Sequence, residues 1–263
     1  MTNFFWRERC DLQRINDDHL SQVAGISKSQ IAKLKEAGIH TMKALAEMAE
    51  DHVISKLNGL SLNTIRQQAR LQNHYRETGE PKVEILPIEI DNKRGFLRLP
   101  EANIGDLYFD MEGNPLEDGG NLEYLFGLYF MDSGKATFKG FWALTREQEK
   151  KTFEDFIDFV SAHLRQFPDA HIYHYAAYEE TAIKRLMSQY GTHEHEVDNL
   201  LRQGKLIDLY KVVREAIRTS EPKYSIKNIE HFYLEKRQGE VTNAGASIIY
   251  FERTGKRQMI RNI

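Results

Sequence analysis

The sequence predicts a mixed α/β sheet domain, flanked by helices, that follows a small all-helical domain. Apolar residues recur at helical intervals between residues 18 and 78. Three successive runs rich in Tyr, Phe, Leu and Trp then indicate strands at residues 106–110, 122–132 and 136–144. Beyond these runs helical and extended patterns alternate, which is typical of a sheet with strands of mixed direction.

Composition limits the classes of protein to which this chain can belong. Its 263 residues suffice for one large or two small domains, and 41% hydrophobic residues support a packed core. The net charge of −3 means that any nucleic-acid contact must use local basic surface. A single cysteine, Cys10, excludes disulfides within the chain. No apolar run reaches the ~18–20 residues of a membrane span, so we expect a cytoplasmic protein without membrane contact.

Glycines divide the first helical region into short helices. Gly25, Gly38 and Gly59 are each followed by an apolar residue and then a polar one. This order is typical of a helix that stops at glycine and of a new helix that begins at a capping side chain. The expected caps are Ser27, Thr41 and Ser61.

The second half of the chain continues the alternation. Residues 83–90 resemble an exposed strand that is broken at Pro87. Helical spacing follows at residues 146–166, then a short strand at 170–175 and a helix that begins near Tyr178. Further helices are expected at residues 194–203, 209–218, 225–233 and 244–253.

Two carboxylates end the strand predicted at residues 106–110. Because strand side chains alternate between faces, Asp110 and Glu112 share one face, while Phe109 and Met111 point to the other. Their Cα atoms lie roughly 6.6 Å apart, or two strand rises. This spacing suits a pair of divalent cations of the kind that hydrolyses phosphodiesters. The alternative is a solvated turn, with Gly113 allowing the backbone to turn away.

A second acidic pair, Glu179 and Glu180, falls in the first turn of the helix expected near Tyr178. Negative charge is favoured there by the helix dipole, which explains most such pairs. Alternatively, one of the two reaches the same metals as Asp110 and Glu112. Asp208 either caps the helix expected at 209–218 or assists the metal site.

The motifs carry a family resemblance. Phe109-Asp-Met-Glu112 resembles the first motif of the ribonuclease H-like exonucleases with four acidic metal ligands. Tyr175-Ala-Ala-Tyr178-Glu179 resembles their second motif, with Tyr in place of Asn and Glu in place of Asp. The resemblance selects Glu179 over Glu180. More narrowly, residues 104–263 resemble the YprB-type domain of RecB-like bacterial nuclease–helicase proteins, through strings that include Leu206-Ile-Asp-Leu-Tyr210 and Tyr224-Ser-Ile-Lys-Asn-Ile-Glu230.

The resemblance implies a nuclease that uses Mg²⁺ or Mn²⁺ and acts 3′→5′ on single-stranded DNA or RNA. Asp110 would bridge two ions, and Glu112 and Glu179 would complete the ligand set. The family's last motif, similar to Tyr-Asn-x-x-Asp, has no counterpart here. Tyr250-Phe-Glu252 has the wrong spacing. One ion and weak or no cleavage are therefore expected, and the alternatives are a non-catalytic nucleic-acid or protein-binding module and a structural remnant.

The N-terminal part carries two further resemblances. Trp6-Arg-Glu-Arg-Cys10 is similar to the end of a RecB-like nuclease domain, so residues 1–16 are expected to be the remnant of a preceding domain in a larger nuclease–helicase. Val23-Ala-Gly-Ile26 and Leu57-Asn-Gly-Leu60 resemble the hairpins of a helix–hairpin–helix domain, expected at residues 17–80. Backbone N–H groups at such hairpins can bind phosphate. The candidate DNA contacts are Lys28, Lys33, Arg66, Arg70 and, in the sheet domain, Lys227.

The expected organisation is therefore a remnant at 1–16, a helix–hairpin–helix domain at 17–80, a connector at 81–103 and a C-terminally incomplete ribonuclease H-like domain at 104–263.

Overall fold

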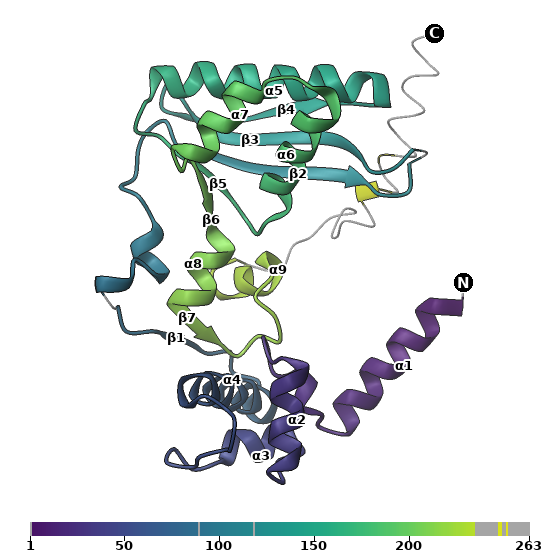
Figure 1. Ribbon diagram of the computed structural model, residues 1–263, viewed down its shortest axis with the longest axis vertical. Helices are drawn as coiled ribbons and strands as arrows, with labels where there is room; N and C mark the ends of the chain where they lie inside the picture. The colour runs from purple at the N-terminus through teal and green to yellow at the C-terminus, as the bar shows by residue number, and fades with distance from the viewer. Residues whose placement is uncertain (1, 89, 118, 235–246, 249–250, 252–263) are drawn as a thin grey trace. The chain divides into compact units, whose positions relative to one another are not determined.

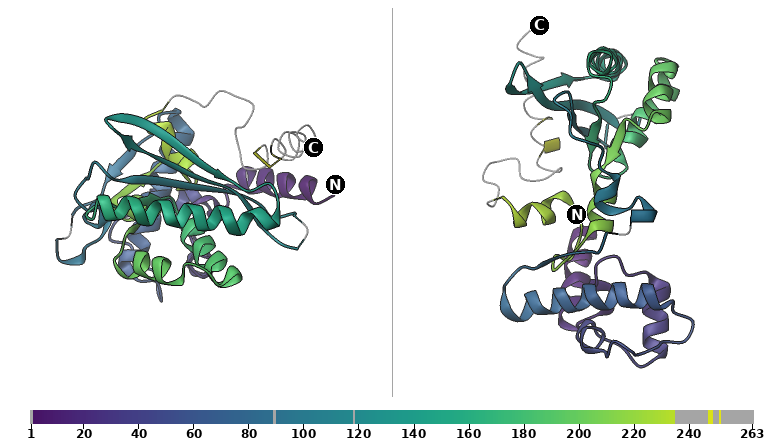
Figure 2. Two further views of the ribbon diagram at one scale, coloured as in Figure 1. Left: turned by 90° about the horizontal axis from the view of Figure 1, so that it is seen from above. Right: turned by 90° about the vertical axis from the view of Figure 1, so that its left-hand side faces the viewer.

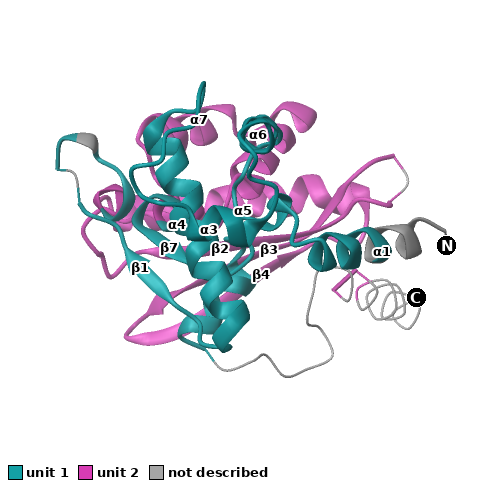
Figure 3. Cartoon of the chain, turned by 90° about the horizontal axis from the view of Figure 1, so that it is seen from below, with its two compact units in different colours: residues 1–96, 213–235 teal, residues 97–212, 236–263 magenta. Residues whose placement is uncertain are grey.

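The chain folds into two compact units. The computed structural model describes residues 2–88, 90–117, 119–234, 247–248 and 251 and, among these, the side chains of all but residues 2–8 and 92. Residues 1–96 and 213–235 form the first unit, and residues 97–212 and 236–263 form the second (Figure 3). No helix among the described residues has the length and apolar character needed to cross a membrane.

The first unit is mainly helical (Figure 1). Its helices include α1 (Thr2–Asn16), α2 (Lys28–Glu36), α3 (Met42–Glu47) and α4 (Gly59–Thr78), and α9 (Ile226–Ile229) adds one short turn. Single 3₁₀ turns lie at Leu20–Gln22, Ile90–Asn92, Gly95–Arg98 and Glu230–Phe232. Apolar faces of α2, α3 and α4 meet in one core, which contains Leu20, Val23, Leu34, Ile39, Met42, Leu45, Ile54, Leu62, Ile65 and Ala69.

Capping side chains begin these helices, as the sequence predicted at two of three positions. Ser27 forms a capping box with Gln30 at the start of α2, and Thr41 accepts a hydrogen bond from Ala44 N at the start of α3. The expected cap at Ser61 is wrong. Asn58 caps α4 instead, because its side-chain oxygen accepts hydrogen bonds from Leu60 N and Ser61 N.

A small sheet ties distant parts of the first unit together. Strand β1 (Val83–Ile85) pairs antiparallel with β7 (Ile217–Thr219). The buried side chain of Gln68 on α4 bridges this sheet to a nearby loop, because its Nε2 donates to Thr219 O at 2.7 Å and its Oε1 accepts from Tyr224 OH at 2.7 Å. Residues 209–218 were expected to form one helix, but α8 (Leu209–Ala216) ends where β7 begins.

Among the described residues, the second unit contains a five-stranded mixed sheet in the order β4-β3-β2-β5-β6. Its strands are β2 (Leu107–Asn114), β3 (Leu122–Asp132), β4 (Lys135–Trp142), β5 (Ile172–His174) and β6 (Leu206–Asp208). β2, β3 and β4 are antiparallel, whereas β5 and β6 run parallel to β2. The mixed α/β sheet predicted from the sequence is confirmed.

Three helices, α5 (Arg146–Gln166), α6 (Tyr178–Tyr190) and α7 (Glu194–Arg202), cover one face of this sheet (Figures 1 and 2). α5 buries Phe153, Phe156, Ile157 and Val160, which recur at helical spacing along one side. They pack against the alternate strand residues Leu107, Phe109, Met111, Phe126, Leu128 and Phe130. The face covered by α5–α7 is called the helix face below, and the opposite one the open face.

Candidate functional site

The carboxylates of Asp110 and Glu112 lie on the open face of the central strand β2. Their neighbours Phe109 and Met111 are buried on the helix face, as the strand alternation predicted. Asp110 is exposed and stands opposite Gly127 of β3, whereas Glu112 is half-buried opposite Leu125. β2 continues to Asn114, so Gly113 does not turn the backbone away as expected.

A β-bulge brings a tyrosine to Glu112. The register between β2 and β3 shifts after Glu112, which leaves Tyr124 as the extra residue. Tyr124 OH donates to Glu112 Oε2 at 3.4 Å and lies 2.7 Å from Ser247 Oγ, while its ring stacks on Phe251 at 4.1 Å between centroids. Burial, together with the charge of Glu112, raises the pKa of Tyr124. Tyr124 thereby keeps its proton and remains a donor to the carboxylate.

The turn between β5 and α6 is held in an uncommon backbone conformation. Ala176 has φ of 76°, in the left-handed region that disfavours residues other than glycine. Asp208 Oδ1 accepts hydrogen bonds from Ala176 N and Tyr210 N, both at 2.9 Å, and Ala176 O lies 2.7 Å from His174 Nδ1. Asp208 thus holds this turn and the start of α8, as its capping interpretation anticipated; its role as a metal ligand stays a prediction.

Glu179 is the buried member of the acidic pair in α6. Its Oε2 has no hydrogen-bond partner among the described residues and lies 3.5 Å from His174 Nδ1. Burial lowers the pKa of His174, but Glu179, the Ala176 carbonyl and Asp208 together act in the opposite direction, and the net shift is upward. Glu180 instead forms a surface ion pair with Lys184, which lowers the pKa of Glu180.

A buried carboxylate oxygen that accepts no hydrogen bond fits a cation ligand, because burial of a charge without hydrogen bonds is costly. Glu179 meets this criterion, but the three predicted ligands form no visible cluster. Among the described residues, no three His, Cys, Asp or Glu side chains are grouped so that they could hold a metal ion. Strand alternation places Asp110 and Glu112 on the open face, whereas Glu179 contacts His174, which shares the face of Ile172, a residue of the core under the helices. Their convergence on one cation stays a prediction.

A buried glutamate that was not predicted as a site residue links the two motifs. Glu123, fully buried on the helix face, accepts hydrogen bonds from Tyr178 OH at 2.8 Å and Arg185 Nη2 at 2.5 Å. Burial raises its pKa, although Tyr178 and Arg185 act in the opposite direction. Tyr178 precedes Glu179, and Glu123 pairs with Gly113, which follows Glu112. A charged residue within the apolar run Leu122-Glu-Tyr-Leu-Phe126 was the one available signal.

Replacing Gly113 with Ala is expected to destabilise the fold by about 1–3 kcal/mol, the usual cost of overpacking. A methyl group at Gly113 would overlap Glu123 Oε2 and approach Tyr178 OH to 2.6 Å. Urea unfolding would measure the loss. Gly134→Ala is unsuitable as a control because φ there is 78°, so Gly59→Ala, where a methyl group meets nothing within 4 Å, serves instead. Equal stability of Gly113→Ala and the wild type would contradict the close approach.

Comparison with known proteins identifies a family for the part of the chain that begins at β2. A family model described as the RNase H superfamily matches residues 107–263, more than half of the chain. The chain belongs to the ribonuclease H superfamily. Neither the curated proteins nor the solved structures gave a match. The superfamily match begins at Leu107, the first residue of β2, and so includes both acidic motifs.

The predicted DNA-contacting cations of this ribonuclease H superfamily protein have different surroundings. Lys33 Nζ donates to Lys56 O at 2.6 Å, and Arg70 forms an ion pair with Glu84 at 2.8 Å. The Arg66 side chain is only 13% exposed and donates to Ala49 O. Lys28 is exposed at the start of α2, and Lys227 lies on α9. Arg66 therefore supports the helical fold, and its loss would not report on DNA contact alone.

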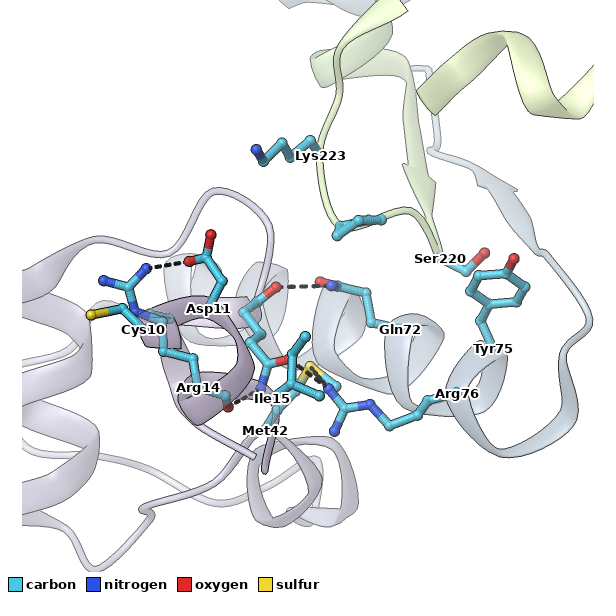
Figure 4. Close-up of a pocket in the computed structure, with 13 residues that line it drawn as sticks. Cys10, Asp11, Arg14, Ile15, Met42, Gln72, Tyr75, Arg76, Ser220 and Lys223 are labelled. Atoms are coloured by element: carbon cyan, nitrogen blue, oxygen red, sulfur yellow. Dashed lines mark hydrogen bonds and ion pairs between the residues drawn. The ribbon is translucent and has the colours of Figure 1, made fainter. Parts of the chain in front are cut away.

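The first unit of this superfamily member also contains a cavity of about 950 Å³ (Figure 4). Its lining includes Cys10, the single cysteine, which is exposed. Arg14 forms an ion pair with Asp11 at 2.9 Å, and Arg76 forms one with Asp18. Within the described part of the chain, Lys223 is thus the cation of this lining without an ion pair. The charges of this lining are therefore largely compensated.

Proposed function

We propose that this chain hydrolyses phosphodiester bonds of nucleic acid with a divalent cation, acting 3′→5′ on single strands. Membership of the ribonuclease H superfamily over residues 107–263 is the observation that carries the proposal. The pair Asp110 and Glu112 on the central strand supports it, because carboxylates are the ligands that Mg²⁺ prefers and Mn²⁺ accepts.

Each residue has a proposed role. Asp110 and Glu112 would hold the cation from the open face, and Glu179 would add a third carboxylate. The bound cation would stabilise the charge that develops on the phosphate and favour ionisation of water. Tyr124, which donates to Glu112, would fix the orientation of that carboxylate, and Asp208 would fix the turn that precedes Glu179.

The first unit is proposed to assist by contacting nucleic acid. We assign residues 17–80 to a helix–hairpin–helix domain, 81–103 to a connector and 104–263 to a YprB-type nuclease domain. The RecB-like nuclease–helicase context, with residues 1–16 as the end of a preceding domain, belongs to the same proposal. The exposed Lys28 at the N-terminal end of α2 supports phosphate contact there, since helix N-termini favour anions.

A cleavage assay tests the proposal. Single-stranded DNA and RNA oligonucleotides labelled at the 5′ end are incubated with the protein and Mn²⁺ or Mg²⁺. A ladder that shortens from the 3′ end is expected, and chelation by EDTA should abolish it because the cation is required. A substrate labelled at the 3′ end should release its label as the first product. Cleavage that persists in EDTA would contradict the proposed chemistry.

A second candidate is a non-catalytic nucleic-acid-binding module. The observation that favours it is the lack of a three-ligand group among the described residues. Such a module would bind the same oligonucleotides without shortening them at any concentration of either cation. Binding without cleavage, measured on the same protein preparation, distinguishes this candidate from the nuclease.

A further inference from the structure

Aromatic side chains gather on the open face of the sheet. Tyr108, Tyr129, Phe138 and Trp142 are 52%, 50%, 59% and 55% exposed, although apolar rings of this size are usually covered. They come from three adjacent strands, β2, β3 and β4. This group of four is called the aromatic patch below.

The strand register arranges the patch in a row beside the acidic pair. Tyr173 stands opposite Tyr108, Tyr108 opposite Tyr129, and Tyr129 opposite Phe138, so one aromatic row crosses four strands. The rings of Tyr108 and Tyr173 stack at 5.5 Å between centroids. The next row contains Asp110, Gly127 and Gly140. The row after it contains Glu112, Leu125 and Trp142.

Two of the rings extend over glycines of the neighbouring strand positions. A methyl group built on Gly127 would lie 3.1 Å from Phe138 Cε2, and one on Gly140 would lie 2.8 Å from Trp142 Nε1 and 3.2 Å from Phe138 Cε1. The rings therefore occupy the space that side chains at these glycines would fill. Aromatic cover of strand glycines is a known packing device. Phe138 and Trp142 are nonetheless more than half exposed, so much of their surface remains open to solvent.

We propose that the aromatic patch stacks on the bases of a single-stranded nucleic acid that approaches Asp110 and Glu112. This proposal rests on the proposed function, whose substrate class it specifies. Flat rings accept any base, because every base has a π face, and stacking of this kind is typical of proteins that bind single strands. The nucleic-acid chain would cross β4 and β3 toward β2, because the rows that contain the aromatic residues lie on both sides of the row that contains Asp110.

The arrangement favours nucleic acid over a protein partner or a second copy of the chain. The Asp110 row places an exposed carboxylate between the aromatic rows. An apolar protein interface would have to remove water from that charge, which is costly. A nucleic acid that arrives with a bound cation meets no such cost, and its bases still cover the rings.

Base-dependent binding is the property to measure. Fluorescence anisotropy with Ca²⁺ as the only divalent cation compares a short oligothymidylate with an abasic oligonucleotide of equal length, and a denaturing gel verifies that neither is cleaved during the measurement. Phe138→Ala and Trp142→Ala are each expected to weaken oligothymidylate binding about tenfold, the usual scale of one lost stacking contact. Neither variant should change binding of the abasic strand. Trp142→Phe keeps a flat ring and should retain most of the affinity.

Controls make the outcomes decisive. Tyr233 is exposed in the first unit, so Tyr233→Ala should bind like the wild type. The chain has two tryptophans, and in a Trp6→Phe background quenching of Trp142 fluorescence by oligothymidylate but not by the abasic strand would support stacking. Unchanged affinity in both patch variants, or equal losses for both oligonucleotides, would overturn the proposal. So would a wild-type dimer that Trp142→Ala converts to monomer in sedimentation.

The binding assay and the cleavage assay test the aromatic patch and the nuclease activity independently of each other. If binding depends on the bases and requires Phe138 and Trp142, but the oligonucleotide is not shortened, the proposal for the aromatic patch is supported and the proposed nuclease activity is contradicted. Cleavage with equal binding of both oligonucleotides would do the reverse.

Discussion

Replacing Asp110 with Asn is expected to reduce the rate of cation-dependent cleavage by more than about 100-fold. Loss of a residue that only hydrogen-bonds a metal ligand typically reduces activity by ~10–100-fold, and loss of a ligand should have a larger effect. The substitution preserves shape but removes the charge that would hold a divalent cation. Asp110 is exposed on β2, so folding should be unaffected, which thermal unfolding would verify. Rates on single-stranded oligonucleotides with Mn²⁺ measure the effect.

The matched control comes from the acidic pair of α6. Glu180→Gln removes a carboxylate that forms a surface ion pair with Lys184, so its rate should stay within about twofold of the wild type. Glu179→Gln should instead lose activity as Asp110→Asn does. An active Glu179→Gln variant would exclude Glu179 from the ligand set, in agreement with its contact to His174 on the helix face.

Replacing Arg185 with Met is expected to cost about 3–5 kcal/mol of stability at neutral pH, because it leaves the buried Glu123 carboxylate without its cation. Tyr178 and Asn121 still donate to Glu123 in the variant. Lys184→Met, which breaks the exposed pair with Glu180 on the same helix, should cost no more than about 0.5 kcal/mol. Urea unfolding of both variants measures the difference.

The cost of losing Arg185 should depend on pH. Burial already raises the pKa of Glu123 in the folded protein, and removing Arg185 should raise it further. A raised folded-state pKa means that the native state binds the proton more tightly, so its stability is greatest at low pH and falls as pH rises through that pKa. The gap between variant and wild type should therefore widen from acid to neutral pH. A gap independent of pH would show that Glu123 is not the group left unpaired.

Local patterns were sufficient to predict most elements of the second unit. The bounds of α5, 146–166, match the prediction because its apolar residues keep helical spacing along the whole helix. β3 at 122–132 matches for the same kind of reason, since its apolar run is long and is bounded by turn residues. The helix expected at 244–253 and the Tyr250–Glu252 string extend over residues outside the described part of the chain.

Local sequence patterns could not predict which distant strands pair or which side chains contact one another. Three-residue strands such as β7 and β6 carry too little periodicity, and β1 meets β7 only because the chain returns to the first unit. α1 was missed since residues 1–16 were interpreted from a resemblance and not from periodicity.

Within the candidate site, alternation predicted that Asp110 and Glu112 share a face, because side-chain direction in a strand is local. The contact of Tyr124 with Glu112 depends on a bulge, and the contact of Glu179 with His174 depends on how β5 joins α6. Neither contact can be predicted from the spacing of residues in the sequence. The sequence predicted that Arg66 and Arg70 contact DNA, but in the fold Arg66 donates to Ala49 O and Arg70 forms an ion pair with Glu84.

The position of β4 at the end of the described sheet has a consequence for solubility. An edge strand offers unpaired N–H and C=O groups to other chains, and exposed rings make such recruitment more favourable. β4 carries Lys135 and Lys139, and Lys139 Nζ lies over the rings of Phe141 and Phe159 at 5.2 and 4.9 Å. A second β4 arriving alongside would bring like charges together. The strand that displays Phe138 and Trp142 thereby carries its own protection against growth into fibrils.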